Sequence, residues 1–137
     1  MKKRKVYLDH NATTPLREEA LLAMGPLLKN IFGNASSVHT FGQEAKKYLE
    51  DAREKTAKLL NAAKPEEIIF TGCGTESDNL AVKGCAFANR DKGNHIITTE
   101  IEHHAVLYTG EFMEKQGFNV TYLPVDGTGR VDRRAHV

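Results

Sequence analysis

Hydrophobic and polar positions change their period along this chain. In the first sixty residues they recur at helical spacing, which predicts a helix over 17–30 and a longer one over 38–60 that Asn61 ends. Further on, short runs rich in β-branched and aromatic residues alternate with helical stretches. The runs predict strands at 67–71, 95–99 and 119–123, and the stretches predict helices at 76–92 and 104–116.

This order of elements predicts an α/β fold. Strands and helices that alternate at this spacing form βαβ crossovers around a parallel sheet. Gly25-Pro26 is expected to kink or split the first helix, because proline lacks a backbone N–H and clashes with the preceding turn. A sheet of three such strands would leave apolar faces uncovered, and Val131-Asp132 reads as the start of a further helix with Asp132 as N-cap. We therefore expect a chain that is cut short.

The composition excludes several function classes. The 137 residues carry 19 Lys and Arg against 18 Asp and Glu, and 40% of them are hydrophobic, as in an ordinary soluble domain. This charge balance gives no reason to expect nucleic acid or a membrane as partner. No apolar run approaches the roughly 20 residues that span a bilayer. The basic start at residues 1–5 lacks the hydrophobic region of a signal peptide, so we expect a cytoplasmic protein.

The strongest chemical motif is the glycine-containing junction at residues 70–77, FTGCGTES. A strand that passes through Gly72 and Gly74 into a helix presents free backbone N–H groups to an anion at the positive end of the helix dipole. The motif is neither a Walker A loop nor a complete Gly-x-Gly-x-x-Gly. Two interpretations stay open: a phosphate site, and a tight turn in which Thr75 only caps the helix.

A second motif, Glu102-His103-His104, follows the second predicted strand. Because parallel strands end at one edge of a sheet, His103 is expected on the same edge as Gly74 and Thr75, where it could stack on a planar ligand or exchange protons. No metal site is expected, since neighbouring helical side chains diverge by about 100°. His104 is interpreted as a solvated helix residue.

The two cysteines are expected to be structural. Cys73 is expected to pack beneath its turn in preference to acting as a nucleophile, and Cys85 to lie in the core.

Several blocks of sequence occur in the order and spacing of one enzyme family. They are YLDHNATTP at 7–15, FGNASSVH at 32–39, FTGCGTESDNLAVKG at 70–84, IITT at 96–99, EHHAVL at 102–107 and GFNVTYL at 117–123. In these blocks the chain resembles the N-terminal part of a cysteine desulfurase, a group related to the class V aminotransferases. Such enzymes have fold-type I and use pyridoxal 5′-phosphate (PLP).

The resemblance implies roles for three residues. Gly74 and Thr75 match the residues that bind the cofactor phosphate, and His103 matches the catalytic histidine that stacks over the pyridine ring and moves protons. It also implies that residues 1–137 are an incomplete class V domain. Within it, 1–62 would be an N-terminal segment and 63–137 the start of the cofactor-binding large domain.

The reaction that the resemblance implies removes sulfur from L-cysteine and leaves L-alanine. An enzyme cysteine would carry the sulfur as a persulfide to an iron–sulfur scaffold or another acceptor protein, and the full-length enzymes would be homodimers. None of the lysines here matches the Schiff-base lysine, and neither Cys73 nor Cys85 matches the persulfide cysteine. The isolated chain is therefore expected to be inactive.

The chain departs from the family pattern in two places. Ala35 stands where the family usually has proline, and Gly72-Cys73-Gly74 replaces the commoner Ser-Gly-Ala. Two alternatives to a cysteine desulfurase stay open. One is a non-catalytic module that binds PLP, phosphate or a partner protein, and the other is another class V enzyme such as a selenocysteine lyase or an aminotransferase.

Overall fold

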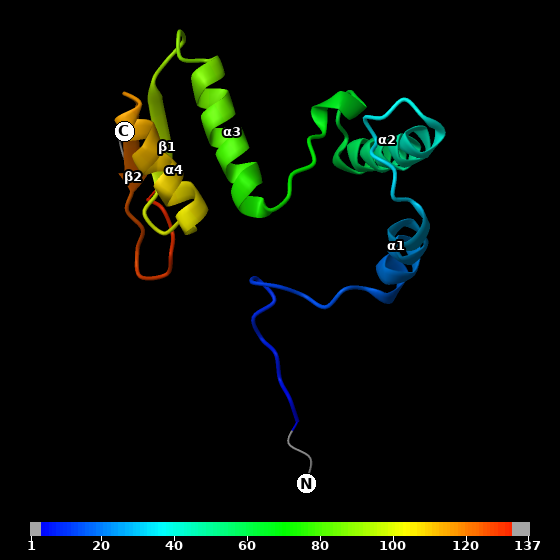
Figure 1. Cartoon of the computed structure of the whole chain (residues 1–137). Helices are drawn as coiled ribbons and strands as arrows, with labels where there is room; N and C mark the ends of the chain where they lie inside the picture. Colours follow the sequence, from blue (N-terminus) through cyan, green and yellow to red (C-terminus); the bar gives the residue numbers. More distant parts are fainter. Residues whose placement is uncertain (1–3, 133–137) are drawn as a thin grey trace. The chain divides into compact units, whose positions relative to one another are not determined.

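The structure, a computed structural model, describes residues 4–132. The chain forms two units, one ending at Ile69 and the other beginning at Phe70, and each is described by itself. The first unit holds α1 (Glu18–Asn30), α2 (Thr40–Leu60) and the 3-10 helix η1 (Pro65–Glu67). The second holds α3 (Gly74–Ala88), β1 (His95–Thr99), α4 (His104–Lys115) and β2 (Asn119–Leu123), all labelled or coloured in Figure 1.

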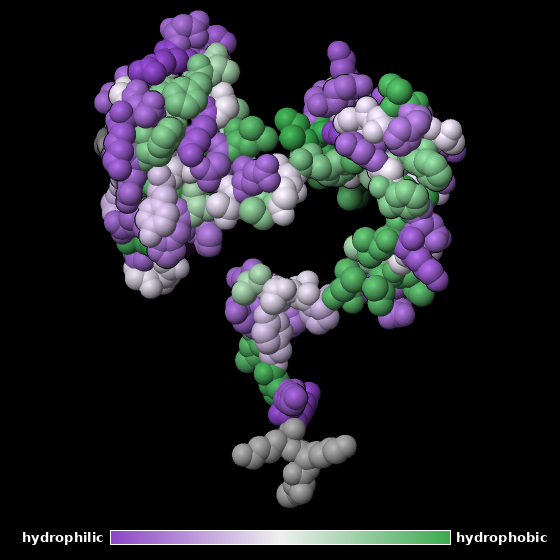
Figure 2. Space-filling view, in the orientation of Figure 1, coloured by the Kyte–Doolittle hydropathy of each residue, from purple (hydrophilic) through white to green (hydrophobic). Residues whose placement is uncertain are grey.

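Helix α1 confirms the predicted helix at 17–30. It runs through Pro26 without a break, so the expected split at Gly25-Pro26 does not occur. Gly25 has no Cβ to clash with the proline ring, which lowers the cost of helical backbone before proline. Three of the four leucine side chains of α1 are exposed, among them Leu22 by 66% and Leu28 by 76%, and Figure 2 shows apolar side chains on the visible face of this helix.

Helix α2 confirms the predicted long helix and its end. It begins after His39, whose Nδ1 accepts a hydrogen bond from the Gly42 N–H at 3.3 Å and so caps the first turn. It ends at Asn61, which adopts the left-handed conformation with φ 55° as the predicted terminator. The N–H of Ala62 closes the end by donating to the carbonyl of Ala57 at 2.9 Å.

The loop before α2 packs closely on the first turn of that helix. A Cβ built on Gly42 would lie 2.4 Å from the carbonyl oxygen of Ser37 and 2.6 Å from that of Asn34, so only glycine fits. Gly33 is equally confined, because its Cβ would lie 2.1 Å from the carbonyl oxygen of Phe41. The glycines of this loop and helix thus fix the entry of the chain into α2.

The predicted strand at 67–71 is wrong. The N–H of Ile68 donates to the carbonyl of Pro65 at 3.0 Å as part of η1, and the Ile68 carbonyl accepts a hydrogen bond from the Arg53 guanidinium. The backbone N–H and C=O of Ile68 therefore both form hydrogen bonds inside the first unit. A strand needs a neighbouring strand to pair with, and a segment rich in β-forming residues does not supply one by its composition. Within residues 4–132 the sheet consists of β1 and β2, so the three-stranded expectation is corrected.

The two remaining strands lie where the sequence predicted them, at 95–99 and 119–123. They pair in parallel, with His95 opposite Asn119 and Thr99 opposite Leu123, and α4 connects them as in a βαβ unit. Helix α3 runs from Gly74 to Ala88, earlier at both ends than the predicted 76–92, and α4 ends one residue before the predicted 116. The α/β prediction is confirmed.

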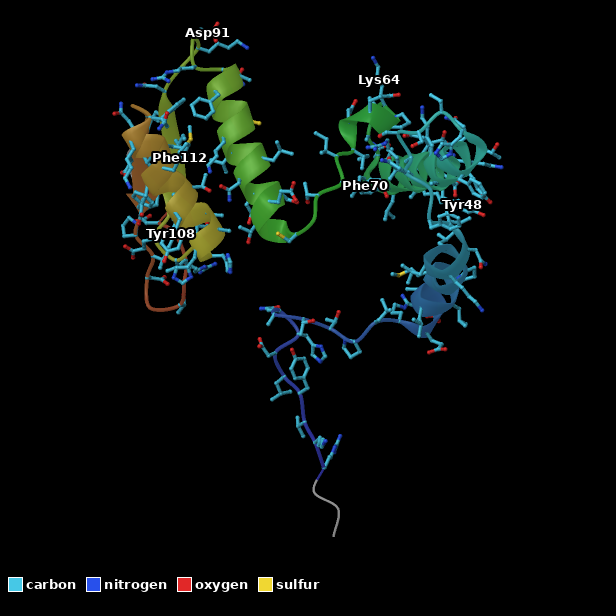
Figure 3. All side chains as sticks on the ribbon, in the orientation of Figure 1. Tyr48, Lys64, Phe70, Asp91, Tyr108 and Phe112 are labelled. Atoms are coloured by element: carbon cyan, nitrogen blue, oxygen red, sulfur yellow. The ribbon has the colours of Figure 1, made fainter. Side chains whose placement is uncertain are left out.

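The core of the second unit lies between α4 and the strands. Ala105, Thr109 and Met113 of α4 are buried together with Phe118, which precedes β2. Helix α3 packs alongside α4 (Figure 3). Nζ of Lys83 in α3 lies 4.3 Å from the centre of the Phe112 ring in α4.

Apolar surface remains exposed in the second unit, as the sequence led us to expect. Ile97 of β1 is 52% exposed. Beyond β2, Val131 forms an isolated antiparallel bridge with Val125, and the rest of the expected helix lies outside the described residues. Across residues 4–132, every helix is too short or too polar to cross a bilayer.

Candidate active site

Both helices of the second unit begin at the edge where its strands end (Figure 1). Gly74 is the first residue of α3, and His103 is the residue immediately before α4. In a parallel α/β sheet this edge collects helix N-termini and the loops that follow the strands, which is where such folds bind ligands. The shared edge expected for Gly74, Thr75 and His103 is therefore present.

The turn into α3 is held by side chains on both sides of Gly74. The Gly72 N–H donates to Oε2 of Glu76 at 2.6 Å. On the other side, the hydroxyl oxygens of Thr71 and Ser77 lie within hydrogen-bond distance of each other and of the Cys73 carbonyl oxygen, which is 3.2 Å from Thr71 and 3.3 Å from Ser77. With one proton each, the two hydroxyls donate two of these three hydrogen bonds at a time. These bonds tie the residues before the helix to its first turn.

The backbone N–H groups of Gly74 and Thr75 remain available at this turn. In the described part of the chain no hydrogen bond engages them, and both residues are exposed. A Cβ built on Gly74 would meet nothing within 4 Å, so a ligand can approach this backbone closely. The helix N-cap is Cys73 and not Thr75, so the interpretation of Thr75 as a mere cap is wrong. Two free donors and the helix dipole suit a phosphate group.

His103 caps α4 through its own ring. Its Nδ1 accepts a hydrogen bond from the Ala105 N–H at 3.1 Å, which requires Nδ1 to be without a proton, so the neutral ring carries its proton on Nε2. The residue is exposed. The same turn is closed by the Thr99 hydroxyl, which donates to Glu102 at 2.9 Å. Among the described residues, no hydrogen bond or ring contact joins His103 to Gly74 or Thr75, although all three lie at the same edge.

His104 is exposed, as the sequence predicted for a solvated helix residue. Its ring centre lies 5.4 Å from that of Tyr108 and 6.1 Å from that of His103. Within residues 4–132, no three His, Cys, Asp or Glu side chains gather as a metal site would require.

Both cysteines differ from expectation. Cys73 is exposed, because the N-cap position places it outside the helix; it does not pack beneath the turn. Cys85 is also exposed, so it is not a core residue. Its helix face is apolar by pattern, but the described residues do not cover that face.

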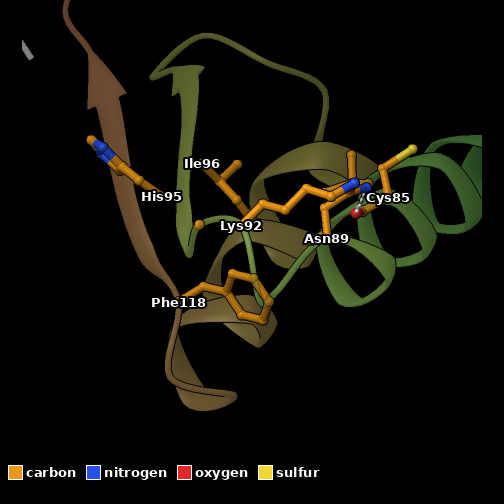
Figure 4. A pocket seen from close by; sticks show the side chains of 9 residues that line it. Cys85, Asn89, Lys92, His95, Ile96 and Phe118 are labelled. Carbon is orange, nitrogen blue, oxygen red and sulfur yellow. Dashed lines mark hydrogen bonds between the residues drawn. The ribbon is translucent and has the colours of Figure 1, made fainter.

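An open pocket of about 500 Å³ lies beside Cys85, at the edge where the strands begin. It is lined by Val82, Cys85, Ala86, Asn89, Lys92, Gly93, His95, Ile96 and Phe118 (Figure 4). Lys92 donates to the Asn89 side chain at 3.0 Å, while the His95 ring bonds to the Thr121 hydroxyl at 2.7 Å. Because this is the opposite edge of the sheet from Gly74 and His103, the pocket is not part of the candidate active site.

The sequence interpretation missed the carboxylates that hold the two turns. Glu76 stands three residues after the N-cap of α3, the place from which an acidic side chain reaches back in a capping box. That spacing was visible in the sequence, although Cys73 replaces the usual Ser or Thr. Glu102 gave no comparable signal, because its partner Thr99 belongs to the preceding strand.

Comparisons with known proteins agree with this arrangement. The chain is 60% identical over 130 residues to the cysteine desulfurase IscS of Dictyoglomus turgidum, covering 95% of this chain and 33% of the relative. It is 56% identical over 126 residues to IscS of Methanosarcina thermophila, covering 92% of this chain and 31% of the relative. The chain thus spans about a third of the length of the curated relatives it matches.

Solved structures show the same fold. A NifS-like protein matches with a TM-score of 0.84 and 43% identity, over 94% of this chain and 35% of its own. The apo cysteine desulfurase of Thermococcus onnurineus matches with a TM-score of 0.76 and 29% identity, over 93% of this chain and 32% of its own. These are fold-type I structures, and the chain has their fold. The model of the aminotransferase class-V family matches residues 6–136, so the chain belongs to that family.

Proposed function

We propose that the protein acts as a cysteine desulfurase, which removes sulfur from L-cysteine and leaves L-alanine. The 60% identity to the IscS of Dictyoglomus turgidum over nearly the whole chain is the observation that carries this proposal. A related structure, 42% identical with a TM-score of 0.75, is that of SspA in complex with cysteine, which supports cysteine as the substrate.

Residues of this chain fit the phosphate of PLP. The free N–H groups of Gly74 and Thr75 at the start of α3 would bind the phosphate oxygens, and the open space beside Gly74 allows the approach. When bound, the cofactor supplies an electron-withdrawing ring that stabilises negative charge on the substrate.

His103 would be the catalytic residue of this segment. The hydrogen bond from Ala105 N–H to Nδ1 holds the ring at the active-site edge and leaves the proton on Nε2. A ring held this way can lie against the cofactor and pass a proton through Nε2 to or from the substrate. Its exposure in the described chain leaves a face free for that contact.

A cysteine of the enzyme would take the sulfur from the substrate. Attack by an enzyme thiolate on the substrate sulfur would form the sulfur–sulfur bond of a persulfide and break the carbon–sulfur bond, whose electron pair stays with the carbon. A proton, equivalent to the one that the enzyme thiol gave up, would then turn that carbon into the methyl group of alanine. An iron–sulfur scaffold or another acceptor protein would then receive the sulfur. Neither Cys73 nor Cys85 has the family position for that thiolate, so we expect residues 1–137 alone to be inactive.

The proposal also takes the domain division, the cellular compartment and the oligomeric state from the family. Residues 1–62 would be the N-terminal segment and 63–137 the start of the cofactor-binding large domain of a cytoplasmic homodimer. The structure divides seven residues later than this, after Ile69.

The test uses the gene product that contains this sequence. It is purified with PLP, given L-cysteine and a thiol reductant, and assayed for alanine and sulfide in equal amounts, with residues 1–137 alone as the comparison. We expect both products from the gene product and neither from the shorter chain. Reversible PLP binding without alanine would favour a non-catalytic module, and a strong preference for selenocysteine would favour a lyase of that substrate.

A further inference from the structure

Glu76 bridges the turn that presents the free N–H groups of Gly74 and Thr75. Its carboxylate accepts the Gly72 N–H at 2.6 Å and so closes a loop over residues 72–76. In a usual capping box the acid at this position bonds the N-cap N–H; here it reaches one residue further back, past Cys73. Both free donors lie inside the closed loop.

This bridge matters because the N-cap contributes no side-chain bond of its own. The side chain of Cys73 makes no capping hydrogen bond, so the reach of Glu76 and the paired hydroxyls of Thr71 and Ser77 hold the turn from its two sides. Because the Glu76 carboxylate accepts the Gly72 N–H, it does not bind the N–H groups of the first turn of α3 and so does not compete with a ligand anion for them. The donors are thus oriented before any ligand arrives, which lowers the entropy cost of binding.

We propose that Glu76 is a positioning residue for the cofactor phosphate. Acting through the Gly72 N–H, it holds the backbone of Gly74 and Thr75 in the conformation that binds phosphate, without contacting the phosphate itself. This inference rests on the proposed function, since it takes PLP as the ligand of that turn.

The experiment compares two probes, PLP and pyridoxal, which differ by the phosphate alone. Equilibrium affinities are measured in the gene product for the wild type and for Glu76→Gln, Glu76→Asp and Glu76→Ala. Gln keeps the length and an acceptor oxygen without charge, and Asp keeps the charge but is one methylene too short. Glu66→Ala, which removes an exposed charge in η1, is the matched control.

We expect the Asp and Ala variants to bind PLP about fivefold more weakly, which corresponds to the loss of one hydrogen bond of about 1 kcal/mol. The Gln variant and the Glu66→Ala control should stay within about twofold of the wild type, and pyridoxal should bind all variants alike.

Two results would overturn the role of Glu76: unchanged PLP affinity in Glu76→Asp and Glu76→Ala, or equal losses for PLP and pyridoxal, which would indicate a general structural defect. A wild type that binds no PLP would instead refute the proposed cofactor, and the role of Glu76 with it. Circular dichroism of each variant separates misfolding from lost phosphate affinity.

Discussion

The hydroxyl oxygen of Tyr122 in β2 is buried against the backbone of Gly110 in α4. A Cβ built on Gly110 would lie 2.6 Å from that oxygen, closer than side chains approach. Among the described residues the hydroxyl has no hydrogen-bond partner. The contact lets α4 lie directly on β2, the strand that ends at the candidate active-site edge, and leaves one polar group unsatisfied.

Replacing Tyr122 by Phe is expected to stabilise the protein by roughly 1 kcal/mol. In the wild type the buried hydroxyl gives up its hydrogen bonds to water without gaining a partner, and the Phe variant removes this desolvation cost. Burial, and then Glu114 and Glu111, raise the pKa of Tyr122. Because the folded pKa is raised, the wild-type protein keeps its stability below about pH 10 and loses part of it as the pH rises through the folded pKa of Tyr122. Urea unfolding at pH 8 and 11 should therefore show the Phe variant gaining most at alkaline pH. An equal or lower stability of the variant would show that the hydroxyl is satisfied in solution.

Replacing Gly110 by Ala should destabilise the protein by about 1–3 kcal/mol, because the added Cβ must displace the Tyr122 ring. The helix propensity gained from alanine, up to about 1 kcal/mol, offsets only part of this cost. In the Tyr122→Phe background the cost should fall, since the closest atom is gone. Unfolding of the two single variants and the double variant gives this coupling, and strict additivity would contradict the contact.

Gly42 is expected to tolerate no side chain. Its Cβ would meet backbone carbonyl oxygens at 2.4 and 2.6 Å, which cannot move without opening the loop before α2. We expect Gly42→Ala to cost about 2–4 kcal/mol in thermal unfolding. Gly84, inside α3 with nothing within 4 Å of its Cβ position, is the matched control, and its alanine variant should be neutral or up to about 1 kcal/mol more stable. Equal effects at the two positions would refute the close packing.

Local pattern was sufficient to predict the elements whose partners are close in sequence. The strands at 95–99 and 119–123 lie where the alternation placed them, because the helix between them brings them together as a βαβ unit. Residues 67–71 are also rich in β-forming residues, yet they form no strand. The N–H of Ile68 donates to Pro65 in η1, and its carbonyl accepts a hydrogen bond from Arg53. Whether a β-rich run becomes a strand depends on a neighbour, and composition does not contain that information.

The candidate site was predictable to a similar extent. The pattern placed Gly74, Thr75 and His103 at one edge, because that follows from parallel topology alone. It did not show that Nδ1 of His103 would cap α4, because that depends on a rotamer. Nor did it show that Cys73 and Cys85 would be exposed, since burial depends on which parts of the chain cover a face.

Asp126 should give the turn after β2 a pH-dependent stability. The Thr128 hydroxyl, and then the backbone N–H groups of Arg130 and Thr128, hold the pKa of this carboxyl below its usual value. A lowered folded pKa means that the stabilisation is present above about pH 4 and is lost as the pH falls through the folded value. The difference in melting temperature between wild type and Asp126→Ala should therefore shrink on acidification. Asp126→Asn keeps an acceptor oxygen but removes the titrating carboxyl, so its difference from the wild type should be smaller than that of Asp126→Ala and should also shrink on acidification. A difference that stays constant with pH for either variant would contradict the assignment.

His103 combines a structural hydrogen bond with the proposed chemistry, and two substitutions separate them. Asn at an N-cap can still accept the Ala105 N–H, so His103→Asn should keep the stability of α4, whereas His103→Ala should lose about 1 kcal/mol. Neither retains a ring that stacks or exchanges protons, so alanine formation from L-cysteine should fall roughly 10²–10⁴-fold in both. Chemical unfolding and turnover of the gene product are measured on the same preparations. Full turnover by His103→Asn would mean that the cap is all this residue provides, because the imidazole would then have no part in the reaction.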